Sequence, residues 1–497
     1  MSDGVMILSE ADTVAVALAD WPAGETRAGL TATEEVKRGH KIARAAMPAG
    51  APVVKYGQMM GVASEDIAEG AFVHTHNCAM PGDHAEMAAP RGALPEAPAR
   101  TTFEGYLRPD GRVGTRNYIG IIASVNCSTT VCDAIAAEAN RTLLPEFPGV
   151  DGFAPIVHAQ GCGMAHQGPG YDALIRVLKG YRDHPNFGGV LIVGLGCEVN
   201  QITLYQPTDW TRERFHSFNM QDVGGSRSAV KRAMELLRPI AAAANEDTRS
   251  TQPVSKLILG MQCGGSDGFS GITCNPALGH ASDLLVAAGG TSILSETPEI
   301  YGAEHLLIAR AGEEGGARIR GMIDWWRDYA ERNGTTLDNN PSPGNKRGGL
   351  TTILEKSLGA VAKGGLSPVS SVHGYAERID GPGFTYMDSP GYDPVVATGQ
   401  IASGANALVF TTGRGSCAGY KPTPSLKLAS NSQVARSMPE DMDIDCGVIL
   451  DGGVSIAEMG QTIYDRVLDM ASGDKPGSEV MGYGDNEFVP WKIGATL

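Results

Sequence analysis

The 497-residue sequence lacks a basic leader, lacks any membrane-length apolar run, and carries fewer cations than anions. Its opening, MSDGVMILSEADTVAVALADW, has acids where a secretory signal has a basic segment. No apolar run approaches the roughly 20 residues that span a bilayer. Lysine and arginine number 40 against 56 acids, which gives a formal net charge of -16. We therefore expect a cytoplasmic protein with no nucleic-acid partner and no membrane partner.

Two common nucleotide-binding motifs are also missing. The strand-like run GVLIVGLGCEVN contains Gly-x-Gly but no third glycine at the spacing of a dinucleotide site, and no Walker A motif is present. The chain has nine cysteines, but in a reducing compartment they are not expected to form a disulfide framework. The cysteines are therefore free for packing, for metal binding or for catalysis.

The composition and the pattern of apolar residues change along the chain, which predicts several domains. Residues 1–79 hold short alternating segments separated by turns, which are typical of a small β-rich module. Residues 80–103 begin with a stretch rich in proline and alanine and are predicted to be a linker. In residues 104–250 and 251–497, short apolar strands alternate with amphipathic helices. This alternation predicts two α/β domains built from βαβ units with parallel sheets.

Four of the predicted strands are followed in the same way by a cysteine, just past the apolar run. These strand-end cysteines are Cys127, Cys162, Cys197 and Cys263. Ligands of open parallel sheets bind outside the carboxyl ends of the strands, so we expect at least two of these thiols to share a site. Thiolates suit zinc, iron and iron–sulfur clusters. A Cys–His nucleophile pair with a histidine near Cys162 is the alternative.

Two further segments carry polar side chains in suggestive places. In FVHTHN, His74 and His76 alternate, so on a strand they would face one side and could form a metal pair, with Asn77 as a neighbouring donor. In CGGSDGFSGITCNPALG, glycines flank Ser266 and Asp267. Such glycines allow backbone N–H groups to turn toward an anion.

Two cationic turns are candidates for holding a carboxylate. SPGNKRGG places Asn345 and Lys346 in a glycine-rich turn, and TTGRGS places Arg414 between glycines just past a predicted strand. A guanidinium in that position suits a bidentate grip on a carboxylate.

Together these motifs resemble the altronate dehydratase/galactarate dehydratase family of sugar-acid hydro-lyases. The resemblance extends over GYLRPDGRVGTRN, GLGCEVNQ, ETPEIYGAE and SPGNKRGGLTTILEKSLG, and the opening module with RGHKIA and HTHN resembles the SAF, or β-clip, domain of that family. The resemblance implies an α/β protein, with a small β-clip domain followed by parallel-sheet catalytic domains. It also implies dehydration of an aldonate or aldarate to a 2-keto-3-deoxy acid, usually with Fe²⁺.

Residue roles follow from this resemblance and from the chemistry of dehydration. The expected metal ligands or near neighbours are the two histidines and the strand-end cysteines: His74, His76, Cys127, Cys162, Cys197 and Cys263. Another divalent metal or an iron–sulfur cluster stays open. The expected substrate-binding residues are Arg414, Lys346, Asn345, Ser266 and Asn77. The candidates for the catalytic base or acid are His158, His166, Glu198, Asp267 and Glu304.

Two other readings stay open. One is a sulfo-lyase acting on sulfolactate, which is similar to the same family and has its SAF part on a separate subunit. The other is a non-catalytic protein that binds sugar acids, which would bind a ligand tightly without turnover. In each case the partner is a small hydroxy acid, and a homodimer or larger homo-oligomer is the default expectation.

Overall fold

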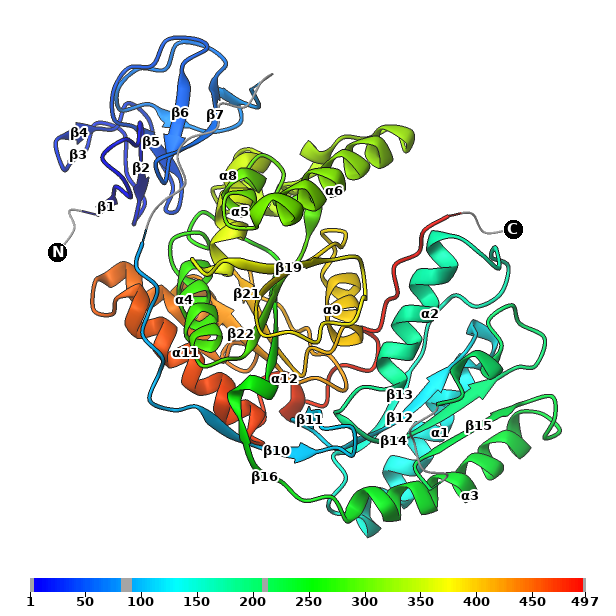
Figure 1. Ribbon diagram of the computed structural model, residues 1–497. Helices are drawn as coiled ribbons and strands as arrows, with labels where there is room; N and C mark the ends of the chain where they lie inside the picture. Colours follow the sequence, from blue (N-terminus) through cyan, green and yellow to red (C-terminus); the bar gives the residue numbers. More distant parts are fainter. Residues whose placement is uncertain (1–3, 82–91, 208–212, 495–497) are drawn as a thin grey trace.

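The computed structural model describes residues 4–81, 92–207 and 213–494, and these residues form three units along the chain (Figure 1). A small β unit comes first, a unit with a four-stranded parallel sheet follows, and a unit with a seven-stranded parallel sheet completes the molecule. The mixed α/β class expected from the sequence is confirmed. Among the helices of these ranges, none has the length and apolarity of a membrane span. Domain boundaries, cellular compartment and oligomeric state stay predictions.

The first unit consists of short antiparallel strands around the buried Trp21. One sheet has the order β1-β2-β5-β8, a second has the order β6-β7-β9, and β3 pairs with β4. Its strands are β1 (Val5–Met6), β2 (Val14–Ala17), β3 (Thr26–Arg27), β4 (Leu30–Thr31), β5 (Lys41–Ala43), β6 (Pro52–Lys55), β7 (Gln58–Ala63), β8 (Phe72–Val73) and β9 (Cys78–Ala79). Because β8 ends at Val73, the strand predicted through His74 and His76 is wrong: both histidines lie in the turn that follows.

The second unit is a parallel sheet of order β13-β12-β14-β15 joined to the third unit by an antiparallel ribbon of order β11-β10-β16. Its elements are β10 (Thr102–Leu107), β11 (Val113–Gly114), β12 (Tyr118–Ala123), α1 (Thr129–Thr142), β13 (Gly152–Ile156), α2 (Pro169–Arg182), β14 (Phe187–Gly194), β15 (Phe215–Asn219), α3 (Ser226–Asn245) and β16 (Ser250–Pro253). Successive residues of a strand face opposite sides of a sheet. Ile119 and Ile121 accordingly pack with α1 and α3, while Tyr118 and Ile122 pack with α2. Both faces are covered, which explains the continuous apolar runs of β12 and β14.

The third unit holds a parallel sheet of order β19-β20-β18-β17-β21-β22-β23. Its strands are β17 (Ile258–Cys263), β18 (Thr291–Leu294), β19 (Val369–His373), β20 (Gly383–Met387), β21 (Ala407–Thr412), β22 (Ser425–Ala429) and β23 (Ile444–Asp445). Its helices are α4 (Cys274–Ala287), α5 (Glu304–Ile308), α6 (Gly312–Arg332), α7 (Pro343–Arg347), α8 (Ile353–Val361), α9 (Asp393–Ala402), α10 (Ser432–Ser437), α11 (Ile456–Ala471) and α12 (Gly477–Val480).

The second and third units share one apolar core. Residues of α4 and α11 pack with Leu259 and Met261 on one face of the large sheet. On the other face, α9 packs against α2 of the second unit, and Phe488 and Trp491 of the C-terminal segment join the same cluster. Figure 1 shows this red C-terminal segment running beside α2. The sheet edges of the two units are therefore held in a fixed relation by buried contacts.

Candidate functional site

A buried cysteine and two buried glutamates meet at the carboxyl end of the seven-stranded sheet. Cys263 is the last residue of β17, and Glu296 and Glu299 follow the neighbouring strand β18. The Cys263 Sγ atom lies 3.6 Å from Glu296 Oε2 and 3.9 Å from Glu299 Oε2. Within residues 4–81, 92–207 and 213–494, this is the one set of three cysteine, histidine or carboxylate donors that lie within 4.8 Å of one another. We call it the Cys–Glu–Glu cluster.

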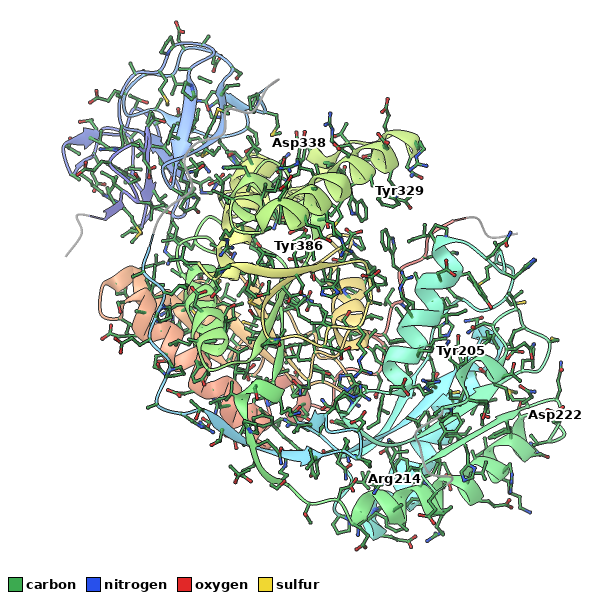
Figure 2. The ribbon with its side chains drawn as sticks, viewed as in Figure 1. Tyr205, Arg214, Asp222, Tyr329, Asp338 and Tyr386 are labelled. Carbon is green, nitrogen blue, oxygen red and sulfur yellow. The ribbon has the colours of Figure 1, made fainter. Side chains whose placement is uncertain are left out.

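Contacts from β20 and the loop after it fix the loop that carries both glutamates. Glu296 adopts the left-handed backbone conformation with φ of 74°, which costs a non-glycine residue roughly 1–3 kcal/mol. Its backbone N–H donates to the Ser389 hydroxyl at 3.0 Å, and the Tyr386 hydroxyl donates to Thr297 Oγ1 at 3.0 Å. Figure 2 shows Tyr386 near the centre of the third unit. Local strain held in place by such contacts is typical of a functional site.

Two buried lysines neutralise the two carboxylates. Lys363 Nζ donates to Glu296 Oε2 at 2.5 Å, and Lys356 Nζ donates to Glu299 Oε1 at 2.7 Å. Lys356 lies in the first half of α8 and Lys363 in the turn after that helix, a segment distant in sequence from both glutamates. The pairing sets an ammonium group against each carboxylate in a buried region, where electrostatic interactions are strong.

The donor set of the Cys–Glu–Glu cluster fits a divalent metal ion. Glu296 Oε1 is buried and has no hydrogen-bond partner among the described residues, so one carboxylate oxygen is left over after the lysine contacts. Burial raises the pKa of the Cys263 thiol to about 12, so the sulfur carries its proton unless a cation binds it. One sulfur with carboxylate oxygens is a mixed donor set that suits iron(II) or zinc(II) better than magnesium.

Asp393 adds a carboxyl group with an unusual pKa to the same edge. Burial, together with the charges of Glu296 and Glu299, raises the pKa of Asp393 to about 8. A Cβ atom at Gly264, directly after Cys263, would lie 2.2 Å from Asp393 Oδ2. Glycine at 264 therefore lets the aspartate approach the end of β17. A carboxyl group that titrates near pH 8 is suited to proton transfer.

The first unit contacts this region through a buried charge cluster. Lys41 and Lys55 both donate to Glu355 of α8, at 2.8 Å to Oε2 and 2.8 Å to Oε1 respectively. All three side chains are at most 1% exposed. Because the next residue along α8 is Lys356, the β unit is fastened to the helix that supplies one lysine of the site.

The predicted histidine pair lies where the first unit meets the third. His74 Nδ1 is buried with no partner among the described residues, and burial lowers the pKa of His74 to about 4. The backbone of Lys346 hydrogen-bonds to the His74 ring. His76 is exposed, and Asn77 Oδ1 accepts from the His74 backbone N–H at 3.0 Å, which closes the turn. His74 therefore reaches the SPGNKRGG turn, and the Cys–Glu–Glu cluster has no histidine member.

The Asp267 carboxylate is hydrogen-bonded to side chains from two loops and holds these loops together. Its carboxylate accepts from the hydroxyls of Ser270 and Ser430 at 2.9 and 2.8 Å and from Asn431 Nδ2 at 3.0 Å. These contacts join the segment after β17 to the segment after β22. A carboxylate with so many donors is suited to positioning the strand-end loops.

The other predicted residues of the third unit surround this framework. Asn345 caps α7 and donates through Nδ2 to the Ser266 carbonyl at 2.7 Å. Lys346 is half-buried in the same short helix, and Arg414 is exposed directly after Gly413 at the end of β21. Glu304 is the first residue of α5. The assignment of these residues to substrate binding or catalysis stays a prediction.

Six predicted residues lie in the second unit, at the edge of the other parallel sheet. His158 is buried, and both its ring nitrogens have backbone partners, at Ala123 and Gln160. Glu198 is also buried and accepts from Ser124 Oγ at 2.6 Å. His166 is exposed. The remaining three are exposed cysteines, Cys127, Cys162 and Cys197. The four strand-end thiols therefore divide between two sheets, with Cys263 alone in the third unit.

Sequence reasoning missed five members of the site. These residues are Glu296, Glu299, Lys356, Lys363 and Asp393. The signal was present in part, because ETPEIYGAE contains both glutamates and ILEKSLG contains Lys356. The run that contains Asp393, SPGYDP, follows the strand β20 at the same sheet edge.

Comparison with known proteins finds one family along the whole chain. Three family models match: the altronate/galactarate dehydratase SAF domain over residues 3–81, the D-galactarate dehydratase/altronate hydrolase second domain over residues 105–245, and the D-galactarate/altronate dehydratase C-terminal model over residues 254–496.

Individual relatives agree with these models. The chain is 39% identical to the L-threo-forming galactarate dehydratase of Escherichia coli K12, covering 90% of this chain and 88% of the relative. It is 34% identical to the altronate dehydratase of Bacillus subtilis 168, covering 98% of each. It is also 32% identical to the β subunit of (2R)-sulfolactate sulfo-lyase of Chromohalobacter salexigens, covering 78% of this chain and 96% of the relative.

Proposed function

The chain belongs to the D-galactarate/altronate dehydratase family, and from this premise we propose the reaction of this hydro-lyase. The reaction is removal of water across C2 and C3 of a hydroxylated sugar acid to give a 2-keto-3-deoxy acid. The observation that carries the proposal is the Cys–Glu–Glu cluster, with its paired lysines and Asp393, at a strand-end edge where α/β enzymes bind ligands.

Three tasks define the chemistry. A base removes the weakly acidic proton beside the carboxylate, positive charge stabilises the enediolate that develops, and an acid assists departure of the 3-hydroxyl. Lys356 and Lys363 bring two ammonium groups to this edge and are suited to the second task. Asp393 carries its proton at neutral pH because its pKa is about 8, so it suits the third.

We further propose that the Cys–Glu–Glu cluster holds a divalent metal, with Fe²⁺ as the expected ion. Cys263, Glu296 and Glu299 would be its ligands, and the unpartnered Glu296 Oε1 supports this assignment. A metal with an open position would polarise the substrate carboxylate and stabilise negative charge on it. Arg414, exposed at the end of β21, is proposed to grip the distal or proximal carboxylate of the sugar acid.

Elimination of sulfite from sulfolactate is a second candidate. The specific observation in its favour is that the chain matches both subunits named for that reaction, including 45% identity over 49 residues to the α subunit of Paracoccus pantotrophus. Sulfite and hydroxide leave from the same position of related hydroxy acids, so both reactions would use the same charge-stabilising edge.

A substrate panel on anaerobically purified protein tests the proposal. Altronate, galactarate, related aldonates and (2R)-sulfolactate are incubated separately, and formation of 2-keto-3-deoxy acid and release of sulfite are measured. The proposal predicts keto acid from one sugar acid and a large loss of turnover in Asp393→Asn. Glu138→Gln, on the exposed face of α1, is the control that retains the rate. Sulfite release alone would favour the second candidate, and tight binding without turnover of any acid would refute both.

A further inference from the structure

The second unit carries a set of three thiols that the proposed dehydration site does not use. Strands β13, β12 and β14 are adjacent and parallel, and their ends are level, since Ile122 pairs with both Ile156 and Ile192. Figure 1 shows the three strands side by side. A cysteine follows each strand at its carboxyl end. We call Cys127, Cys162 and Cys197 the three-cysteine edge.

Hydrogen bonds join the three loops next to their cysteines. The Asn126 backbone N–H, beside the first cysteine, donates to the Gln160 carbonyl at 2.9 Å. The Asn200 backbone N–H, in the third loop, donates to the Gly161 carbonyl beside the second cysteine at 3.0 Å. These bonds tie the loop after β13 to both of its partners. The three thiols therefore stand on loops that are hydrogen-bonded to one another.

Glu198 also joins these loops, and its contacts account for the burial of its side chain. It follows the third cysteine directly, and its carboxylate accepts from Ser124 Oγ at 2.6 Å and from the Gly196 backbone N–H at 2.6 Å. It thereby joins the loop after β14 to the loop after β12. Gly161 contributes as well, because a Cβ atom there would lie 2.4 Å from the Ser124 carbonyl oxygen. These contacts hold together the three loops that carry the exposed thiols.

Exposure argues against a packing role for these thiols. All three are exposed, whereas the chain's other cysteines among the described residues, apart from Cys417, are buried. Cysteine is among the residues most often buried when it only fills space. Three exposed thiols that follow adjacent, buried strands are arranged as ligands would be.

The separation of the three thiols argues against a single metal ion as their ligand. The three Sγ atoms do not all lie within 4.8 Å of one another, which is wide for a single tetrahedral ion. An iron–sulfur cluster binds each thiolate to a different iron and so accepts a wider set. We propose that the three-cysteine edge binds a [4Fe–4S] cluster through three thiolates. Each thiol gives up its proton as its sulfur binds iron, and the fourth iron has no cysteine ligand and is open to an oxygen ligand.

The test uses the full chain and counts cluster components. Protein purified without oxygen is reconstituted with ferric iron, sulfide and a thiol reductant, and then iron, labile sulfide and visible absorbance are measured. The wild-type chain should hold about four irons and four sulfides at the three-cysteine edge, in addition to about one iron at the Cys–Glu–Glu cluster. Cys127→Ser, Cys162→Ser and Cys197→Ser should each lose most of both. Cys417→Ser is the matched control, because Cys417 is also exposed and follows a strand, but in the third unit, and should load like the wild type.

A second readout does not depend on variants. Alkylation of the wild-type chain followed by mass spectrometry should label Cys417 in both states, and the three-cysteine edge only after the cluster is removed. Iron without labile sulfide in the wild type would overturn the proposal. So would a cluster that persists in the three single variants, or equal alkylation of the edge in the loaded and cluster-free protein.

Discussion

Glu355→Gln is the substitution that most directly tests how the first unit is held to the third. Glu355 accepts from Lys41 of β5 and Lys55 of β6, and also from the Thr351 hydroxyl at 2.8 Å. The change removes the carboxylate charge that pairs with two buried ammonium groups. Removing one partner of a buried ion pair costs about 3–5 kcal/mol, because the remaining charge stays buried. We therefore expect local opening of β5 and β6 to rise roughly 10²- to 4 × 10³-fold.

Hydrogen exchange measured by mass spectrometry reads this opening directly. Peptides covering β5 and β6 should exchange faster in Glu355→Gln by that factor, while peptides of the second unit should not change. Arg238→Gln, which breaks the exposed pair with Glu146, is the control and should match the wild type. Exchange in β5 and β6 that is equal in Glu355→Gln and the wild type would refute the reasoning.

The buried contact of Glu355 with Lys41 and Lys55 also makes the stability of β5 and β6 depend on pH. Burial alone would raise the pKa of Glu355, but the charges of Lys41 and Lys55 outweigh burial and hold the pKa well below its usual range. A carboxyl with a depressed pKa stabilises the fold above its unfolded pKa of about 4.3 and loses that contribution as pH falls toward the folded value. Protection of β5 and β6 should therefore decline below about pH 4 in the wild type and depend much less on acid in Glu355→Gln.

Three further outcomes are expected. Asp393→Asn should lower kcat by about 10²- to 10⁴-fold with little change in KM, because it removes a proton donor and keeps the shape; a normal kcat would exclude Asp393 from proton transfer. Gly264→Ala places a Cβ atom 2.2 Å from Asp393 Oδ2 and 2.5 Å from the Phe410 ring, so it should cost about 1–3 kcal/mol of thermal stability, measured by calorimetry, with loss of turnover. Tyr386→Phe removes the hydroxyl that donates to Thr297 and should cost about 1 kcal/mol in the same measurement; a cost above that of Gly264→Ala would contradict the account.

The strands and their order of appearance could be predicted because long apolar runs mark buried parallel strands. YIGIIASVNC contains β12, GVLIVGLGC contains most of β14, and SKLILGMQC contains β17, while the helices α1 and α2 follow the predicted segments. The spatial order of the strands could not be predicted, because a parallel strand can insert at either side of its predecessor. That order decides which strand ends meet, and it separates Cys263 from the other three thiols.

The candidate site shows the same limit at the level of side chains. Glu304 and Lys346 were chosen from ETPEIYGAE and SPGNKRGG, while the structure gathers Glu296, Glu299 and Lys356 from the same neighbourhoods. Residue type pointed to the correct segments. Which residue of each segment enters the site depends on a left-handed turn at Glu296 and on the helix register of α8. Both are set by tertiary packing.

The central claim is that dehydration of a sugar acid occurs at the Cys–Glu–Glu cluster. The measurement that tests it most directly compares iron content and sugar-acid turnover of the wild type with those of Glu296→Gln, which keeps the side chain's size while removing the charge that pairs with Lys363. The account predicts that the variant loses one bound iron per chain and most of its turnover, while cluster content at the three-cysteine edge is unchanged. Wild-type turnover in Glu296→Gln would contradict the account.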